Sequence, residues 1–311
     1  MNQHDDKKQL DISVIIATCD RARGLETTLD HLRRQEVEGL SWELIVIDNG
    51  STDDTQAVLD RARGDFALVN IYEPISGKSR CINRALDVAR GRLLVFTDDD
   101  VELTPAWIAT MHRASKRYVK YAIFCGPVVA KFPPEMPAWL REHWFSVVAF
   151  GNWIPEEPEG PLTKMPCGAN YAVRASAVAG LRFDTTLGPQ KGKSPMGEES
   201  KFISRLLHQG ERIIYVPSVP VKHSVPSKHT ELSWLFTRAF RYGRGIGHAF
   251  PRAPIRLLYG VPIRLTRYLL SRLSSTQIRF ETGIRFYMDW GELYEYCFSR
   301  SEESRPAGSQ P

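Results

Sequence analysis

Apolar strands and amphipathic helices alternate along the first hundred residues, and this alternation constrains the fold more than any other feature of the chain. The runs Ile12–Ala17 and Leu44–Ile47 are rich in β-branched residues and almost free of polar ones, as expected of parallel strands that are covered on both faces. Between them, leucines 25, 29 and 32 recur at helical spacing. Repeated strand–helix–strand units form an open sheet with right-handed crossovers. We therefore predict an α/β fold with a Rossmann-like, mostly parallel central sheet flanked by helices.

Further elements continue this pattern along the chain. We expect strands at Ala67–Ile71, Leu93–Phe96, Ile123–Ala130 and Ile213–Val216. The strand Ile213–Val216 is the last clear one in the sequence. We expect helices around Ile82–Ala89 and after Thr104-Pro105. A nucleotide-binding half is typical of such a pattern. Neither a G-x-G-x-x-G nor a Walker A sequence occurs, which argues against the dinucleotide and P-loop classes.

A chain of 311 residues can bury one large α/β domain and carry an appendage. We expect five parts: a flexible N-terminus (1–10), a nucleotide-binding half (11–120) and an acceptor-binding, catalytic half (121–230) of one domain (11–230), a basic helical region (231–300) and a disordered tail (301–311). The aromatic-rich stretch between Pro133 and Pro161 is either an acceptor-binding or lid element or a local core.

Charge is distributed unevenly along the chain. Residues 1–100 carry 13 basic and 19 acidic residues, whereas ten arginines and only Glu281 lie between Trp234 and Arg285. Leucines and isoleucines alternate there with arginines from Arg256 to Arg272, a pattern typical of a basic amphipathic helix at an anionic membrane surface. An ordinary packed helix with a solvated arginine face explains the pattern equally well. Aromatic residues are not spaced as a stacking platform, which argues against nucleic acid as the partner.

The sequence also favours a cytoplasmic protein. Its five cysteines are scattered, odd in number and without C-x-x-C spacing, so we expect reduced thiols rather than disulfides or a zinc site. The polar N-terminus has no apolar segment of the secretory type, and no run of about 18 apolar residues occurs. We therefore predict a cytoplasmic location, with peripheral attachment to the inner membrane face where the basic region binds lipid.

Three carboxylates, Asp98, Asp99 and Asp100, directly follow the apolar strand Leu93–Phe96. Closely spaced carboxylates repel one another unless a cation or hydrogen-bond donors offset their charge. Mg²⁺ and Mn²⁺ prefer oxygen ligands, and ligands bind at the carboxyl ends of strands in α/β sheets. A divalent-cation site is therefore one interpretation, and a solvated acidic loop that caps the next helix is the other.

Other polar residues leave the first strands at the same sheet edge. Thr18 to Arg21 follow the first strand, and Asp48 ends the second, where it could accept a hydrogen bond from a nucleobase. Gly77 to Arg80 open a helix whose free N–H groups, together with Arg80, could hold a pyrophosphate. A surface ion pair is the alternative interpretation of Arg80.

These segments together resemble family 2 glycosyltransferases of the GT-A fold. The resemblance extends over about Ser13 to Gly247, and its motifs occur in order: Ser13–Thr18 with Arg21, Val46–Asp53, Gly77–Ala85, Asp98-Asp99-Asp100 as a D-x-D motif, Gly168–Arg174, and Gly197-Glu198-Glu199. Cys81 and Ile82 depart from the usual small residue and arginine of the helix motif.

The resemblance implies a role for each site residue. Asp48 would bind the base in a pocket lined by Ala17, Thr18 and Arg21, and Asp98 would bind the ribose, with Asp99 in support. Gly77 and Arg80 would hold the diphosphate, and Asp100 would bind Mg²⁺ or Mn²⁺, with His223 as a further ligand. Gly168, Ala169 and Asn170 would contact the donor sugar or the acceptor. The alternatives are a structural histidine at position 223 and a backbone-satisfying role for Asn170.

The remaining task is proton removal from the acceptor hydroxyl. Glu198 and Glu199 lie at an expected helix N-terminus, where the dipole favours the ionised carboxylate. The family pattern favours Glu199 as the base, and the alternative is that both glutamates only cap the helix. One base without a covalent intermediate implies an inverting transferase that moves a sugar, most simply from a UDP-sugar, to a glycan or lipid-linked hydroxyl acceptor.

Two other classes compete with this interpretation. A nucleotidyltransferase shares a similar nucleotide-binding half, but the G-x-G-T-R-type loop typical of that class is missing after Thr18. A non-catalytic nucleotide-sugar or membrane-binding module would not need all three aspartates and both glutamates.

Overall fold

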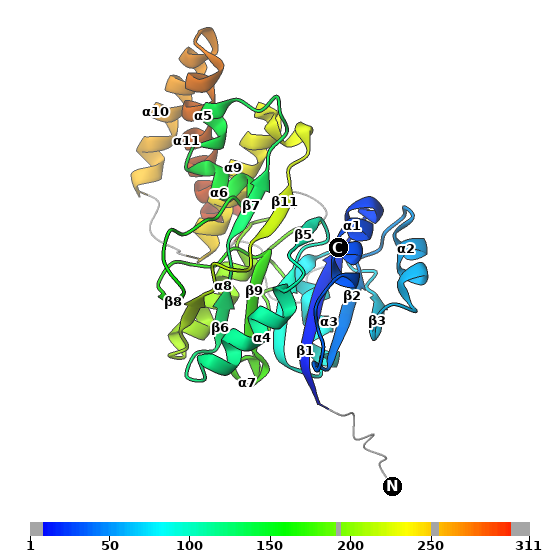
Figure 1. The fold of residues 1–311 in the computed structure, drawn as a ribbon. Helices are drawn as coiled ribbons and strands as arrows, with labels where there is room; N and C mark the ends of the chain where they lie inside the picture. Colours follow the sequence, from blue (N-terminus) through cyan, green and yellow to red (C-terminus); the bar gives the residue numbers. More distant parts are fainter. Residues whose placement is uncertain (1–8, 191–193, 250–254, 300–311) are drawn as a thin grey trace, which may run out of the picture. The chain divides into compact units, whose positions relative to one another are not determined.

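The computed structural model describes residues 9–190, 194–249 and 255–299 (Figure 1). The predictions for residues 1–8 and for the tail at 301–311 lie outside these ranges. Two compact units make up the chain. The first contains the described residues up to Lys131, Phe150–Thr185 and Glu198–Ser224, and the second contains Phe132–Ala149, Thr186–Gly197 and the described residues from Val225 onward.

An eight-stranded sheet forms the centre of the first unit, in the order β3-β2-β1-β4-β9-β6-β10-β8. Its strands are β1 (Leu10–Thr18), β2 (Trp42–Asp48), β3 (Leu68–Tyr72), β4 (Gly91–Thr97), β6 (Ile123–Cys125), β8 (Gly160–Leu162), β9 (Asn170–Arg174) and β10 (Ile213–Tyr215). The first four are parallel, while β9 runs antiparallel to both β4 and β6. The predicted mostly parallel sheet is confirmed.

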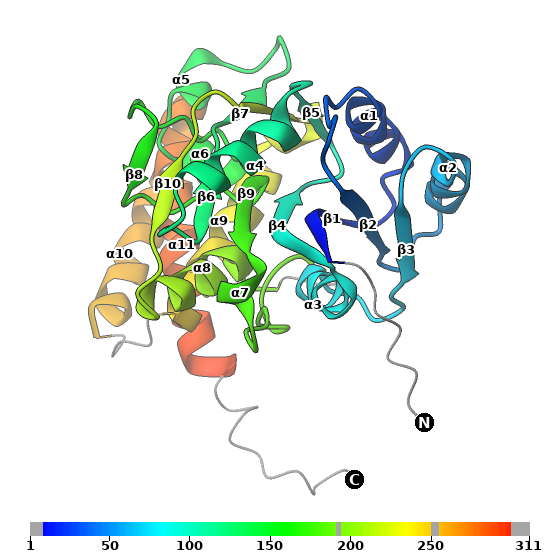
Figure 2. The same cartoon turned by 60° about the horizontal axis from the view of Figure 1, so that its bottom comes forward.

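Helices cover both faces of this sheet (Figures 1 and 2). One face packs against α1 (Ala22–Arg33), α2 (Thr55–Ala62) and α4 (Trp107–Arg117). The other packs against α3 (Lys78–Val88), α7 (Ala175–Val178) and α8 (Glu198–His208). Val14 faces the first group and its neighbour Ile15 the second, and both are buried. Burial on both faces explains why the strand sequences are apolar at nearly every position.

Gly91 sets how closely the two central strands approach each other. It begins β4, and a Cβ atom at this position would lie only 2.1 Å from the backbone nitrogen of Ser13 in β1. No side chain fits there without separating the strands. The N–H of Gly91 donates to Ser13 Oγ at 2.8 Å, which fixes the start of the β1–β4 pair.

The structure also contains a second sheet of three strands, which differs from the sequence-based predictions in two ways. It contains β5 (Val101–Leu103), β7 (Val128–Lys131) and β11 (Val221–Ser224), in the order β5-β11-β7. The predicted strand Ile123–Ala130 is therefore two strands in different sheets, because Pro127 lacks an N–H and interrupts the ladder. The strand β11 also follows β10, which was predicted to be the last.

The second unit is helical. Its elements are α5 (Ala138–Arg141), α6 (Phe145–Phe150, whose last residue belongs to the first unit), η1 (Ser227–Thr230), α9 (Leu232–Ala249), α10 (Ile255–Leu270), η2 (Ser271–Leu273), α11 (Thr276–Tyr294) and a π-helical turn, η3 (Glu295–Ser299). The helices α9 and α11 approach closely, since a Cβ on Gly243 would lie 1.9 Å from the carbonyl oxygen of Met288. None of the described helices has the length and hydrophobicity needed to cross a bilayer.

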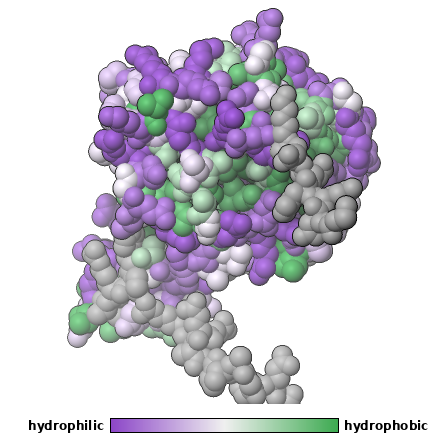
Figure 3. Space-filling view, turned by 90° about the horizontal axis from the view of Figure 1, so that it is seen from below, coloured by the Kyte–Doolittle hydropathy of each residue, from purple (hydrophilic) through white to green (hydrophobic). Residues whose placement is uncertain are grey.

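Hydrophobic surface is gathered in places rather than spread evenly. On the face shown in Figure 3, hydrophobic residues lie near the middle and hydrophilic residues surround them. Among the described residues the most exposed large hydrophobic side chain is Leu273 of η2, and several others belong to α10. Exposed apolar side chains in such groups mark surfaces with a binding role.

Candidate active site

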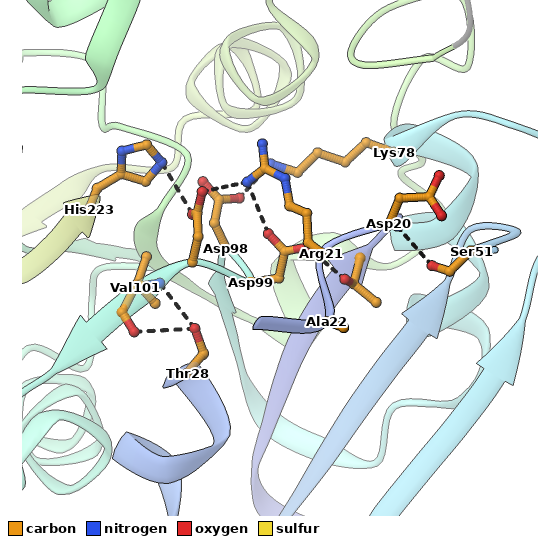
Figure 4. Close-up of polar contacts among 12 residues, drawn as sticks. Asp20, Arg21, Ala22, Thr28, Ser51, Lys78, Asp98, Asp99, Val101 and His223 are labelled. Atoms are coloured by element: carbon orange, nitrogen blue, oxygen red, sulfur yellow. Dashed lines mark hydrogen bonds and ion pairs between the residues drawn. The ribbon is translucent and has the colours of Figure 1, made fainter. Parts of the chain in front are cut away.

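The three neighbouring aspartates lie between β4 and β5, at the carboxyl end of a central strand. Figure 4 shows Asp98 and Asp99 with the side chains of Arg21, Lys78 and His223 directed toward them. Arg21 precedes α1, Lys78 begins α3 and His223 lies on β11. Three separate segments thus bring cationic or ionisable side chains to one acidic turn.

Asp99 is the most buried of the three carboxylates, with 4% of its surface exposed. Thr18 Oγ1, at the end of β1, donates to its Oδ2 at 2.6 Å, and Arg21 Nη1 lies 3.2 Å from its Oδ1. Burial raises the pKa of Asp99 to about 6, although the positive charge of Arg21 opposes this shift. Its oxygens are occupied by protein donors, so Asp99 holds the turn and Arg21 in place.

Asp98, Asp100 and His223 form a group that could hold a metal ion. One ligand atom from each residue lies within 4.8 Å of the other two. His223 Nε2 is 3.2 Å from Asp100 Oδ1, because His223 pairs with Val101 in the antiparallel β5–β11 ladder. Arg21 also contacts Asp100. The negative charges of Asp100 and Asp98 raise the pKa of His223, although burial opposes this.

The atoms of this group fit a divalent cation. His223 Nδ1 is buried and has no hydrogen-bond partner among the described residues, and the contact that the structure gives buried Asp100 Oδ1 is with His223 Nε2. Such orphaned atoms are uncommon in native proteins and call for an explanation such as an absent ion. Two carboxylates and one imidazole suit Mn²⁺ or Mg²⁺. The sequence analysis placed Asp100 and His223 at the metal and assigned Asp98 to the ribose, whereas the geometry adds Asp98 to the same ligand group.

Lys78 connects the acidic turn to the expected base. Its Nζ donates to Asp98 Oδ1 at 2.7 Å and to Glu199 Oε1 at 2.9 Å. Burial opposes ionisation of Asp98, but the charges of Lys78 and His223 lower its pKa to about 2. Sequence reasoning named Arg80 in this segment and missed Lys78. A lysine as the first residue of a helix that leaves the ligand-binding sheet edge was the available signal.

The two glutamates at the start of α8 differ in burial. Glu198 is 5% exposed. Burial and the neighbouring charge of Glu199 raise the pKa of Glu198 to about 8. Glu199 instead pairs with Lys78, with 19% of its side-chain surface exposed. The raised pKa of Glu198 favours its protonated form, and Glu199 is the carboxylate that contacts Lys78.

A small cavity lies beside Glu199 in the first unit. Its lining residues come from five segments: Ile15, Ala17, Lys78, Ile82, Phe96, Thr97, Gly168, Tyr171 and Glu199. Gly168 is required by space, since a Cβ there would lie 2.7 Å from Glu199 Oε1. Thr97 Oγ1 donates to the carbonyl oxygen of Ala169 at 2.9 Å, which joins the Gly168-Ala169 segment to the end of β4.

The expected nucleotide-binding residues lie along the carboxyl ends of β1 and β2. Asp48 is buried next to Thr18 in the parallel ladder, and its Oδ1 accepts from the N–H of Ser51 at 2.9 Å. Gly77, with φ of 148°, precedes α3 and donates its N–H to Asn49 Oδ1 at 2.7 Å. The guanidinium of Arg80 has no ion pair or hydrogen bond within the described ranges, so it is free to meet a ligand.

Asn170 is occupied by the protein itself. It is fully buried, its Nδ2 donates to the carbonyl oxygens of Pro127 and Val219 at 2.9 and 2.8 Å, and its Oδ1 accepts from Trp107 Nε1 at 2.9 Å. This arrangement favours the alternative stated above, in which Asn170 satisfies backbone groups. Its effect on a bound sugar would then be indirect, through the position of the segment before β9.

Comparison with known proteins decides the family. The model of glycosyl transferase family 2 matches residues 13–184, more than half of the chain. The chain belongs to glycosyl transferase family 2. The resemblance seen in the sequence is thereby confirmed, and the protein is a glycosyltransferase. The competing interpretations as a nucleotidyltransferase or a non-catalytic module lose their basis.

Two curated relatives span most of the chain. The succinoglycan biosynthesis protein ExoM of Rhizobium meliloti is 27% identical over 76% of this chain and 74% of its own length. The glucosyl-dolichyl phosphate glucuronosyltransferase of Haloferax volcanii is 24% identical over 75% of both proteins. A shorter match, 32% identical over 34% of this chain and 35% of its own length, is the GalNAc(5)-diNAcBac-PP-undecaprenol beta-1,3-glucosyltransferase of Campylobacter jejuni.

Solved structures confirm the GT-A fold. The mannosyltransferase PcManGT from Pyrobaculum calidifontis, in complex with GDP-Man and Mn²⁺, aligns with a TM-score of 0.57 at 20% identity, over 98% of this chain and 78% of its own. TarS 1-349 of S. aureus, in complex with UDP-GlcNAc, aligns with a TM-score of 0.53 at 12% identity, over 94% of this chain and 92% of its own.

Proposed function

We propose that this family 2 glycosyltransferase moves a sugar from a UDP-sugar to a hydroxyl group of a glycan or lipid-linked acceptor, with inversion at the anomeric carbon. The observation that carries the proposal is the bridge from Asp98 through Lys78 to Glu199. It joins an acidic cation site to the Glu199 carboxyl group within a single unit of the structure. A single-displacement transfer needs both groups next to the same anomeric carbon.

In the proposed reaction, the acceptor oxygen forms a bond to the anomeric carbon while the bond from that carbon to the diphosphate oxygen breaks. The bonding electrons leave with the nucleoside diphosphate, and the proton of the acceptor hydroxyl passes to Glu199. Lys78 orients the Glu199 carboxylate through its hydrogen bond. Glu198, which holds a proton at neutral pH, does not compete for this role.

Charge accumulates on the diphosphate as it departs. Asp98, Asp100 and His223 would hold a Mn²⁺ or Mg²⁺ ion, which when bound supplies positive charge to the leaving diphosphate. The Arg80 guanidinium would add hydrogen bonds to the same phosphates. Asp48 would bind the base in a pocket lined by Ala17, Thr18 and Arg21, and Asp98 would also contact the ribose. The Gly168–Asn170 segment would border the donor sugar.

The nucleotide and the acceptor are inferred from relatives. A structural neighbour was solved with UDP-GlcNAc and another with GDP-Man, so the donor experiment must compare both bases. The names of two curated relatives include a dolichyl phosphate and a PP-undecaprenol, which supports a lipid-linked acceptor and work at a membrane surface. We also propose residues 11–230 as the transferase region and 231–300 as a helical extension, whose described residues form one compact unit with Phe132–Ala149 of that region.

The test separates cation binding from proton transfer. Thermal unfolding is measured with UDP or GDP in the presence and absence of Mn²⁺, since a ligand that binds only the folded protein raises its stability. We expect UDP with Mn²⁺ to stabilise the wild type and Glu199→Gln, but not Asp100→Ala. Release of UDP from UDP-sugars should fall at least about 100-fold in Glu199→Gln. If turnover is unchanged in Glu199→Gln but lost in Glu198→Gln, the base assignment must be reversed. A product that keeps the donor's anomeric configuration would contradict inversion.

A further inference from the structure

The helix α10 leaves most of its hydrophobic surface exposed. Only Leu257 and Val261 are buried, with 3% and 7% of their surface exposed. Six other large apolar side chains are between 49% and 74% exposed: Ile255, Leu258, Tyr259, Ile263, Leu269 and Leu270. Leu273, in the following turn η2, is 98% exposed. A surface helix normally turns such residues toward its neighbour.

These six side chains occupy one side of the helix. At 3.6 residues per turn they fall within an arc of about 140°, and Leu257 and Val261 lie opposite. α10 packs against α11 in the second unit, and the exposed arc has no packing partner among the described residues. We call this arc the α10 face. It is contiguous, unlike the scattered apolar residues found on any protein surface.

Of the arginines in α10, Arg256 and Arg267 lie within about 40° of one edge of the α10 face, whereas Arg264 lies on the buried side of the helix. Arg256 and Arg264 form ion pairs with Glu292 and Asp289 of α11. In contrast, Arg267, Arg272 and Arg285 are exposed and have no acidic partner in the part of the chain that the structure describes. Burial and the positive charges of Arg256, Arg285 and Arg267 lower the pKa of Arg264. The arginines are therefore close enough to repel one another, and an anionic partner would relieve this repulsion.

We infer that the α10 face docks this protein on an anionic lipid bilayer, with its apolar side chains in the headgroup–acyl boundary and its arginines on lipid phosphates. An apolar face bordered by basic residues is the pattern of interfacial helices. A second copy of the chain is less suitable, since a two-fold symmetric contact would bring two sets of arginines without acidic partners into one interface. The inference rests on the second unit alone and does not depend on the proposed transfer reaction.

Vesicle binding by the full chain tests the inference. Co-sedimentation with vesicles of phosphatidylcholine alone is compared with vesicles that contain about 30% phosphatidylglycerol, at low and high salt. We expect binding to the anionic vesicles, weakened by salt. The double variant Arg267→Glu/Arg272→Glu should bind at least about 25-fold more weakly, because each basic side chain near an anionic surface strengthens binding about fivefold. Leu258→Ser/Tyr259→Ser should lose at least about tenfold.

Matched controls change the same chemistry elsewhere. Val119→Ser removes another exposed apolar side chain, and Arg113→Glu/Lys120→Glu makes the same charge change at exposed positions of the first unit. Both should bind vesicles as the wild type does. The inference would be overturned if the protein bound neutral and anionic vesicles equally, or if both α10 variants bound as the wild type does. It would also be overturned if sedimentation velocity showed a dimer that the Leu258→Ser/Tyr259→Ser variant does not form. Absence of sugar transfer with intact vesicle binding would contradict only the proposed function.

Discussion

Asp98, Asp99 and Asp100 are identical in chemistry and adjacent in sequence, but their partners give them different properties. Lys78 and His223 lower the pKa of Asp98 to about 2 even though burial opposes ionisation. Asp99 lies deeper and its pKa rises to about 6, with Thr18 and Arg21 on its oxygens. Asp100 instead contacts His223 through one oxygen and Arg21 through the other. The partners that the fold supplies therefore give different properties to three aspartates that are equivalent in the sequence motif.

Lys78 is the residue whose loss should affect the site most directly. Lys78→Met keeps the length of the side chain but leaves Asp98 and Glu199 without their shared cation. We expect a loss of about 1 to 3 kcal/mol in the free energy of unfolding, because the partly buried Asp98 and Glu199 carboxylates would lose the cation that offsets their repulsion. Turnover of the donor should fall at least about tenfold, and Lys78→Arg should restore part of both.

Chemical denaturation and initial rates measure these two effects. Lys120→Met is the matched control, since Lys120 is exposed and makes no ion pair within the described ranges. Equal stability and turnover in Lys78→Met and the wild type would show that the bridge to Glu199 has no role.

Glu198 should make stability depend on pH. Its folded-state pKa of about 8 lies above the ordinary value of 4.5, so the folded protein holds a proton that the unfolded chain releases. The resulting stabilisation is complete below pH 4.5 and is lost as pH rises through about 8. Glu198→Gln cannot ionise, and so it should be more stable than the wild type at pH 8.5 by at least about 1 kcal/mol. Thermal unfolding between pH 5 and 9 measures the difference, and a constant difference across this range would contradict the raised pKa.

At the scale of secondary-structure elements, the strands and helices predicted correctly are those that depend on local residue patterns. The strands β1 to β4 and the helices between them follow from apolar runs and helical spacing. The break at Pro127 and the short strand β11 were missed, since Val221–Ser224 has only four residues and a mixed pattern. The consequence for the site is large, because β11 carries His223 beside Asp100. The Lys78–Glu199 pair joins residues 121 positions apart, and no local pattern indicates such a contact.

Gly91 tests how tightly the two central strands must pair. Gly91→Ala would place a Cβ 2.1 Å from the backbone nitrogen of Ser13, and backbone cannot move as a flexible side chain does. We expect a loss of at least about 3 kcal/mol in the free energy of unfolding, the upper range for overpacked sites. Gly64→Ala is the control, since no atom lies within 4 Å of its added Cβ. Urea unfolding should show a change below about 0.5 kcal/mol for the control, and a similarly small change for Gly91→Ala would contradict the close approach.

At the scale of the whole molecule, the two units are not consecutive in sequence. The second unit takes Phe132–Ala149 from the middle of the chain and joins it to residues beyond Val225. Trp139 of α5 packs on Phe280 of α11 with ring centroids 5.1 Å apart, and His143 contacts the same ring at 5.0 Å. The proposed domain boundary at residue 230 would therefore separate side chains that pack together within one unit.

Truncation after residue 230 should leave this middle segment without its packing partner. Because Phe280 would be absent, the side chains of Trp139 and His143 would become exposed to water, and Arg238 would no longer donate to the carbonyl oxygen of Val148. We expect the fragment to bind the hydrophobic dye ANS and to unfold at a lower temperature than the full chain. A fragment 1–230 that melts like the full chain and binds no dye would show that the transferase domain folds independently of α9 to α11.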